Sequence, residues 1–133
     1  MAGPVAAEIR QAGASVRAAI GGLAVVDAWP NAPHPAHADD LLPERVLFGE
    51  AEARERLVEL CYRPVSNASG ALVETVQALL ETNGNIEATA RSLFVHPNTL
   101  RYRLSRVSEL TGYDARESRD AFALRLAFTL ARL

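Results

Sequence analysis

The residues best suited to chemistry lie between positions 91 and 106, where four arginines occur with no acidic residue among them. Guanidinium groups bind phosphate oxygens and the hydrogen-bonding edge of guanine. Asn98 falls within the same stretch and carries an amide that can pair with adenine, while Thr99 supplies a hydroxyl for backbone contacts. This combination is typical of a surface that binds nucleic acid. The alternative interpretation is a solvated helix face on which the arginines serve solubility.

Two short amphipathic helices are expected to position these side chains. In the first, Ile86, Ala90 and Leu93 follow an i, i+4, i+7 spacing that places them on one face. Asn85 has the short polar side chain that suits the N-cap of this helix. Residues 94–96 then interrupt the pattern, so we expect the first helix to end in a tight turn.

The second helix is predicted to begin at Pro97, because proline is tolerated in the first turn of a helix. Leu100, Leu104 and Val107 repeat the i, i+4, i+7 spacing and define its inner face. Two amphipathic helices joined by about three residues are the signature of a helix-turn-helix, whose second helix enters the major groove of DNA.

The outer face of the second helix, together with the start of the first, supplies the predicted DNA contacts. Residues near the start of the second helix would reach base edges, and the later arginines would bind phosphates. A backbone amide at the start of the first helix would add a phosphate contact. The predicted DNA-binding residues are Asn85, His96, Asn98, Thr99, Arg101, Tyr102, Arg103 and Arg106.

The run NGNIEATARSLFVHPNTLRYRLSRVSELTGYD resembles the C-terminal helix-turn-helix of the PucR/CdaR family of bacterial transcription regulators. Its block FVHPNTLRYRL is close to that family's signature, and the wider arrangement is similar to the Fis-type helix-turn-helix. The resemblance is strong from Leu72 to the C-terminus. It is weak upstream, where residues 39–41 resemble a short phrase ahead of the family's helical linker. Tyr102 departs from the Fis-like pattern, in which many helices carry a basic residue at that place.

This resemblance implies a sequence-specific transcription regulator that binds double-stranded DNA as a homodimer on an inverted repeat in the bacterial cytoplasm. It also implies an upstream domain through which a small-molecule effector acts. The alternative from another functional class is a helical dimerisation or protein-interaction module that does not bind DNA. The net charge of −2 supports that alternative, although residues 1–70 carry a net charge of −3 and residues 71–133 a net charge of +1.

The upstream part of the chain is predicted to contain one helix and one strand. Residues 4–20 favour a helix that the glycine pair at positions 21 and 22 would end. Residues 23–26 form a short apolar run with β-branched members, as a buried strand ending near Trp29 would. Because a single strand needs partners, we expect residues 1–48 to be the remnant of a larger regulatory domain and the chain to be a fragment of a longer regulator.

Residues 30–43 contain four prolines and are predicted to be a loop. Within this loop His34 and His37, with Asp39 and Asp40 close by, have a spacing at which zinc could bind. No helix fixes these side chains relative to one another. A solvated loop with ordinary polar residues is therefore the preferred interpretation, and no metal site is predicted.

The rest of the chain is predicted to be helical, so the expected fold is mainly α. A linker over residues 49–70 contains one helix at residues 50–62, and its remaining residues have the composition of a flexible connection. A PucR-type helix-turn-helix domain follows at residues 71–133. Within it, a helix over residues 71–82 would support the two DNA-binding helices from behind.

A last helix, from Glu117 to Leu133, is apolar on more than one face and would cap the core or meet a partner subunit. The predicted core of the helix-turn-helix domain consists of Leu79, Leu80, Ile86, Ala90, Leu93, Leu100, Leu104 and Val107.

The sequence also argues against several other classes of protein. It has no run of 18 apolar residues and no secretory signal at its start, so we expect a cytoplasmic protein. It lacks a serine, histidine and acid arrangement and a glycine-rich phosphate loop, so neither an enzyme nor a cofactor is predicted. The single cysteine, Cys61, lies in an apolar helical stretch and is expected to be buried and unreactive.

Overall fold

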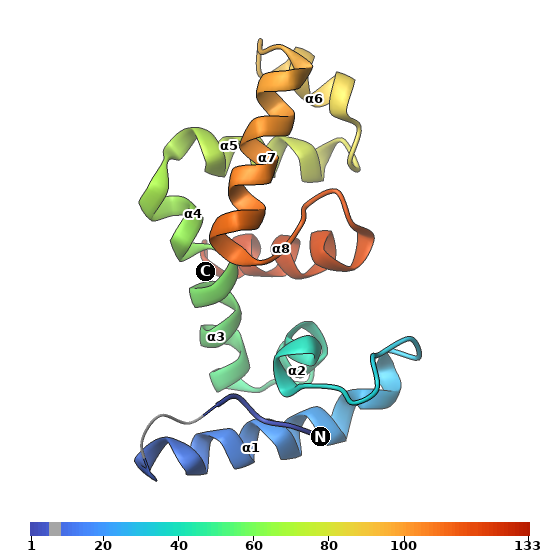
Figure 1. Ribbon diagram of the computed structural model, residues 1–133, viewed down its shortest axis with the longest axis vertical. Coiled ribbons are helices and arrows are strands. Elements are labelled where there is room, and N and C mark those ends of the chain that lie inside the picture. Colours follow the sequence, from blue (N-terminus) through green and yellow to red (C-terminus); the bar gives the residue numbers. More distant parts are fainter. Residues whose placement is uncertain (6–8) are drawn as a thin grey trace. The chain divides into compact units, whose positions relative to one another are not determined.

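The computed structural model describes residues 1–5 and 9–133, and its contacts divide the chain into two compact units, residues 1–56 and 57–133. Both units are built from helices (Figure 1). The part of the predicted first helix that covers residues 6–8 lies outside the described residues. No described helix has the length and hydropathy that a membrane-spanning segment needs.

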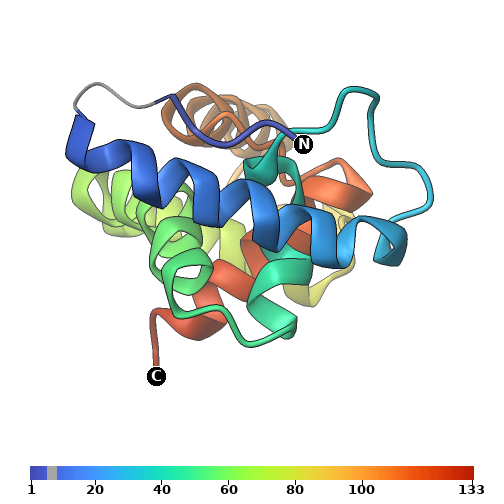
Figure 2. The same ribbon diagram turned by 90° about the horizontal axis from the view of Figure 1, so that it is seen from below.

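The first unit is organised around α1, which contacts both η2 and α2. The first residues of the chain lie along α1 (Figure 2), where the Ser15 hydroxyl donates a hydrogen bond of 2.6 Å to the Pro4 carbonyl. Leu41 and Leu42 are fully buried and form the centre of this unit. Its helical elements are α1 (Ile9–Val25), η1 (Val26–Ala28), η2 (Ala38–Leu41), α2 (Leu42–Leu47) and the first part of α3 (Ala51–Cys61).

The strand predicted at residues 23–26 is wrong. Residues 23–25 are the last turn of α1, and the described residues contain only one isolated β-bridge, between Ala2 and His37. The helical period explains the result, because Ala18, Gly22 and Val25 are buried at an i, i+4, i+7 spacing while none of the intervening residues is buried. Four apolar residues in a row cannot distinguish a strand from a helix by themselves.

The glycine pair does not end α1, contrary to the prediction. Gly21 lies inside the helix, and a Cβ atom at this position would collide with the Glu50 carboxylate. The glycine therefore permits a close approach between α1 and the start of α3, which offsets its low helix propensity.

The predicted loop at residues 30–43 also contains more helix than expected. The 3₁₀ segment η2 begins at Ala38, and α2 begins at Leu42 with Pro43 in its first turn. Proline is acceptable there because the amide groups of the first helical turn have no partner within the helix.

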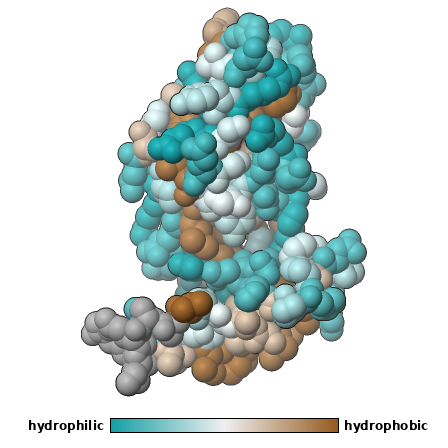
Figure 3. Space-filling model, in the orientation of Figure 1, coloured by the Kyte–Doolittle hydropathy of each residue, from teal (hydrophilic) through white to brown (hydrophobic). Residues whose placement is uncertain are grey.

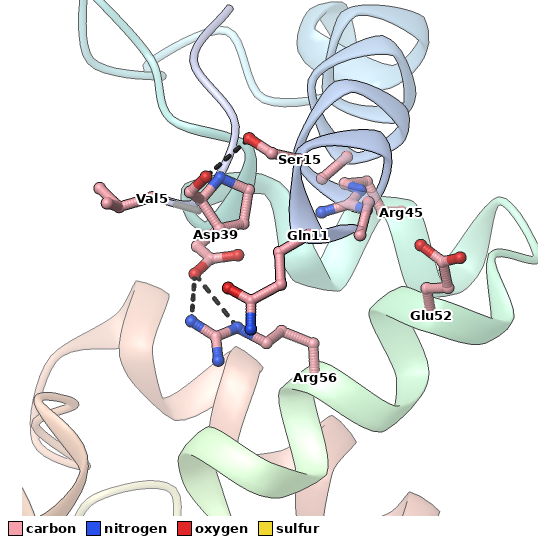
Figure 4. A pocket seen from close by; sticks show the side chains of 10 residues that line it. Val5, Gln11, Ser15, Asp39, Arg45, Glu52 and Arg56 are labelled. Carbon is pink, nitrogen blue, oxygen red and sulfur yellow. Dashed lines mark hydrogen bonds and ion pairs between the residues drawn. The ribbon is translucent and has the colours of Figure 1, made fainter. Parts of the chain in front are cut away.

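Ion pairs line a cavity of about 340 Å³ in the first unit (Figure 4). Arg56 donates hydrogen bonds of 3.0 and 3.3 Å to Oδ2 of Asp39. The side chain of Arg45 is only 3% exposed and donates bonds of 2.8 and 3.0 Å to Oε2 of Glu50. Asp39, Arg45 and Arg56 are thus lining residues of the cavity whose charges are paired.

Asp39 and Asp40, which the sequence analysis considered as zinc ligands, bind neighbouring protein groups. Oδ2 of Asp40 accepts a hydrogen bond of 2.9 Å from the His37 amide, and Asp39 binds Arg56. Among the described residues, no group of three or more histidine, cysteine, aspartate or glutamate side chains could hold a metal ion.

The second unit contains the helices that the sequence analysis placed downstream, with one addition. Residues 63–68 form a short helix where a flexible connection was predicted, and Pro64 occupies its first turn. Ser69 then separates two helices, since its hydroxyl caps the next one by accepting a hydrogen bond of 3.1 Å from the Ala71 amide. Its helical elements are the second part of α3, α4 (Arg63–Ala68), α5 (Gly70–Glu81), α6 (Ile86–Ser92), α7 (Pro97–Thr111) and α8 (Ser118–Leu130).

The core of the second unit lies where α5 contacts α6, α7 and α8. Six of the predicted core residues are buried, whereas Ile86 and Leu93 are only half-buried. The buried face of α8 adds Leu124 and Phe128, and the Phe128 ring meets Tyr62 edge to face at 5.1 Å. The confirmed core residues are Leu79, Leu80, Ala90, Leu100, Leu104 and Val107.

Candidate nucleic-acid interface

The two helices of the helix-turn-helix begin with side-chain caps. Asn85 is the N-cap of α6, as predicted, and its Oδ1 accepts a hydrogen bond of 2.9 Å from the Ala88 amide. His96 is the N-cap of α7, and its Nδ1 accepts a bond of 3.0 Å from the Asn98 amide. Pro97 follows in the first helical turn. The cap and the proline together fix where the second helix starts.

A hydrogen-bonded pair of hydroxyls fixes the start of α6 against the end of α5. The Oγ1 atoms of Thr82 and Thr89 are 2.6 Å apart, and Thr89 also donates a bond of 2.7 Å to the Asn85 carbonyl. Thr89 is fully buried although it is polar. Its spacing of three from Ile86 and of four from Leu93 places it on the inner face, so the sequence carried a signal for this position.

The turn between α6 and α7 contains Phe94 in a left-handed conformation, with φ of 56°. The Val95 amide donates a bond of 3.0 Å to the Ala90 carbonyl, which closes the end of α6. Ala90 is 2% exposed, and it lies on α6, which contacts α7. Phe94 has no predicted role in the sequence, although an aromatic residue in a turn is a visible signal.

The outer face of α7 presents the predicted base-reading residues to solvent. Asn98, Thr99 and Arg101 are all exposed in its first two turns, and Tyr102 is 74% exposed. Arg103 is half-buried. The structure thus places Asn98, Thr99, Arg101 and Tyr102 at the exposed start of α7, whereas Arg103 is partly covered.

Acidic residues just outside the basic stretch lie near two of its arginines. An Nη2 atom of Arg101 is 3.9 Å from a carboxylate oxygen of Glu87, and Arg106 donates a bond of 3.1 Å to Glu109. Arg91 and Arg103 make no ion pair with any residue that the structure describes. Exposed ion pairs of this kind are weak, so a phosphate or a guanine can replace the carboxylate.

Hydrophilic side chains cover much of the surface formed by the second unit in the view of Figure 3. Exposed apolar side chains are present there nonetheless, and Phe94 is the most exposed of them at 95%.

Comparison with known proteins identifies the helix-turn-helix. Residues 72–130 match the PucR C-terminal helix-turn-helix domain. The carbohydrate diacid regulator of Escherichia coli is 38% identical over 84 residues, which are 63% of this chain and 22% of that protein. The purine catabolism regulatory protein of Bacillus subtilis is 40% identical over 62 residues, which are 47% of this chain and 12% of that protein.

Longer matches extend this similarity over most of the chain. An uncharacterised protein of Mycobacterium tuberculosis is 47% identical over 131 residues, which are 98% of this chain and 32% of that protein. The chain thus spans about a third of the length of this relative. The crystal structure of a regulator of polyketide synthase expression from Bifidobacterium adolescentis matches 90% of this chain and 48% of that one, with a TM-score of 0.84 and 39% identity. Residues 72–130 are therefore a PucR-type C-terminal helix-turn-helix domain, and the relatives of the chain include regulators of the PucR/CdaR family.

Proposed function

We propose that this chain is the DNA-binding part of a sequence-specific transcription regulator and that α7 lies in the major groove. The observation that carries the proposal is the exposed cluster of Asn98, Thr99 and Arg101 at the capped start of α7. A recognition helix makes its base contacts from its first residues. Relatives whose names describe regulators support the same function.

In this proposal Asn98, Thr99 and Arg101 contact base edges, and Arg103 and Arg106 contact phosphates. Arg101 exchanges its long ion pair with Glu87 for a bond to the DNA, which costs little because the pair is exposed. Tyr102 contacts the DNA beside them through its hydroxyl.

Asn85 and His96 have a different place in the proposed complex. The side chain of each already accepts a hydrogen bond from its own helix. We therefore assign both residues chiefly to the positioning of the two helices, with their contacts to DNA supplied by neighbouring backbone amides.

Dimerisation and the wider organisation of the regulator are part of the same proposal. Two copies of α7 about one DNA turn apart would match an inverted repeat. The net charge of −2 makes non-specific attraction weak, so two binding helices would supply the affinity that one lacks. Residues 1–48 would belong to a regulatory domain, residues 49–70 would link it to residues 71–133, and an effector would act through the upstream part of a cytoplasmic regulator.

Selection of bound duplexes from a random pool, carried out at two salt concentrations, tests the proposal. It predicts an enriched inverted repeat whose affinity falls as salt rises. The rival interpretation, a helical interaction module, predicts that no sequence is enriched while the chain still self-associates in sedimentation analysis. Enrichment of a single half-site would support DNA binding and reject the dimer.

A further inference from the structure

We infer that Phe94 makes an apolar contact with DNA at the edge of the major groove, against a thymine methyl group or a deoxyribose. The inference rests on the proposed function and adds a residue of a different chemical kind to its polar contacts. Two observations on one residue support it. Phe94 is 95% exposed, and its backbone has a φ of 56°.

The backbone conformation of Phe94 is unfavourable for a bulky residue. The left-handed region brings Cβ close to the following carbonyl, so it is occupied chiefly by glycine and, less often, by asparagine. The other left-handed positions of the described chain follow this rule, since they hold Asn83 and the glycines at 49, 84 and 112. Glycine at position 94 would form the same turn without this cost.

The fold gains no packing from the ring in return. With 95% of the residue exposed, the ring is not part of the buried core around α5, α6 and α7. A side chain that strains the backbone and exposes apolar surface to water stabilises nothing in the free unit. In a complex, a contact with a partner would bury the apolar surface of this ring.

The position of Phe94 in the chain selects DNA as the partner. Two trans peptide units of about 3.8 Å each keep its Cα within about 7.6 Å of the Cα of His96, the N-cap of α7. The major groove is about 12 Å wide. If the first turn of α7 lies in this groove, Phe94 lies within side-chain reach of the groove or its rim.

The charge beside Phe94 favours the same partner. Arg91 is exposed, lies three residues before Phe94, and makes no ion pair with a described residue. The Phe94 amide donates a hydrogen bond of 3.2 Å to the Arg91 carbonyl. An exposed apolar ring and an exposed arginine three residues apart suit the rim of the groove, where sugar and methyl surface adjoins phosphate.

The experiment measures the affinity of four variants for a duplex selected by the wild-type chain. Phe94→Asn and Phe94→Gly both suit a left-handed backbone and remove the ring, so we expect affinity to fall about fivefold or more from the lost apolar burial. Phe94→Tyr keeps the ring and should bind within about twofold of the wild type. Phe48→Asn removes another exposed phenylalanine, 69% exposed in the first unit, and should leave affinity unchanged.

Two further measurements identify the contact. The salt dependence of binding should stay the same in Phe94→Asn, because an apolar contact releases no counterion. Replacement of each thymine of the duplex by deoxyuridine removes its methyl group. If the ring contacts one of these methyl groups, the replacement at that position should weaken binding by the wild type. The same replacement should not weaken binding by Phe94→Asn. A loss in Phe94→Asn with no sensitive thymine would assign the contact to a deoxyribose.

Wild-type affinity in both ring-free variants, with circular dichroism spectra showing that they fold, would overturn the inference. Weakened binding by Arg101→Ala in the same series would then show that the proposed function stands without the Phe94 contact. If the wild-type chain selects no duplex at all, the proposed function and this inference fail together.

Discussion

Nη1 of Arg101 donates a hydrogen bond of 3.1 Å to Oδ1 of Asn98 on the exposed face of α7. We propose that both residues contact base edges. The bond therefore orients the Arg101 guanidinium and the Asn98 amide relative to each other in the protein without DNA. An oriented guanidinium loses less side-chain freedom when it binds a guanine. The pair therefore forms a small preorganised surface at the start of the helix.

Arg101→Ala should weaken binding to a selected duplex by about 1–3 kcal/mol and relax the base preference at one position. The reason is the loss of a guanidinium contact together with the loss of the orientation of Asn98. Fluorescence anisotropy titration measures the affinity. Arg54→Ala, which removes an exposed arginine from the first unit, serves as the charge-matched control. Unchanged affinity and unchanged base preference in Arg101→Ala would refute the role of this residue.

Ala90→Leu should destabilise the second unit by about 1–3 kcal/mol, because the side chain is 2% exposed and a larger one would force α6 and α7 apart. Urea unfolding followed by circular dichroism measures the change. Ala68→Leu is the control, since Ala68 is exposed at the end of α4 and its replacement should change stability by less than about 0.5 kcal/mol. Equal stability of the two variants would show that the approach of the helices is not tight.

Phe94 provides a test of backbone strain that needs no DNA. Phe94→Asn should keep or raise the melting temperature, since asparagine tolerates the left-handed conformation that costs other residues about 1–2 kcal/mol. Phe94→Val should lower it, because a β-branched residue fits that conformation worst. Thermal unfolding of both variants makes the comparison. A higher melting temperature for valine than for asparagine would mean that the turn has a different conformation.

Cys61 should make stability depend on pH above the neutral range. Burial raises the pKa of its thiol from the ordinary value of 9.0 to about 12, although a hydrogen bond with Tyr113 acts in the opposite direction. The folded state therefore holds this proton more tightly than the unfolded state does. The associated stability is complete below pH 9.0 and is lost as pH rises towards about 12.

The difference in unfolding free energy between the wild type and Cys61→Ala isolates this effect. It should shrink as pH rises from 9.0 towards about 12, because the thiol of the unfolded wild type ionises in this range before that of the folded protein. A difference that is constant across this range would contradict the assignment of the raised pKa to the buried thiol.

The helix-turn-helix could be predicted because local signals agree there. Leu100, Leu104 and Val107 repeat with the helical period, and Asn85 caps the first helix as its side chain suggests. The strand at residues 23–26 was mispredicted because four apolar residues suit either structure. Only the packing of Ala18 and Val25 decides between the two structures.

The finer features of the site depend on contacts that sequence periodicity does not show. The ion pair of Arg101 with Glu87 joins two helices, so a count of acidic residues along α7 could not find it. The left-handed conformation of Phe94 was equally hidden, because glycine is the residue that normally marks such a turn.

The most direct test of the central claim compares a selected duplex with a shuffled duplex of the same composition, using the wild type and the Asn98→Ala, Thr99→Ala, Arg101→Ala triple variant. All three substituted side chains are exposed, so the variant should keep its helical circular dichroism. We predict that the wild type prefers the selected duplex by a factor on the order of 10³ and that the variant binds both duplexes equally weakly. Equal binding of the two duplexes by the wild type, or a preference that survives in the triple variant, would contradict the assignment of α7 as the recognition helix.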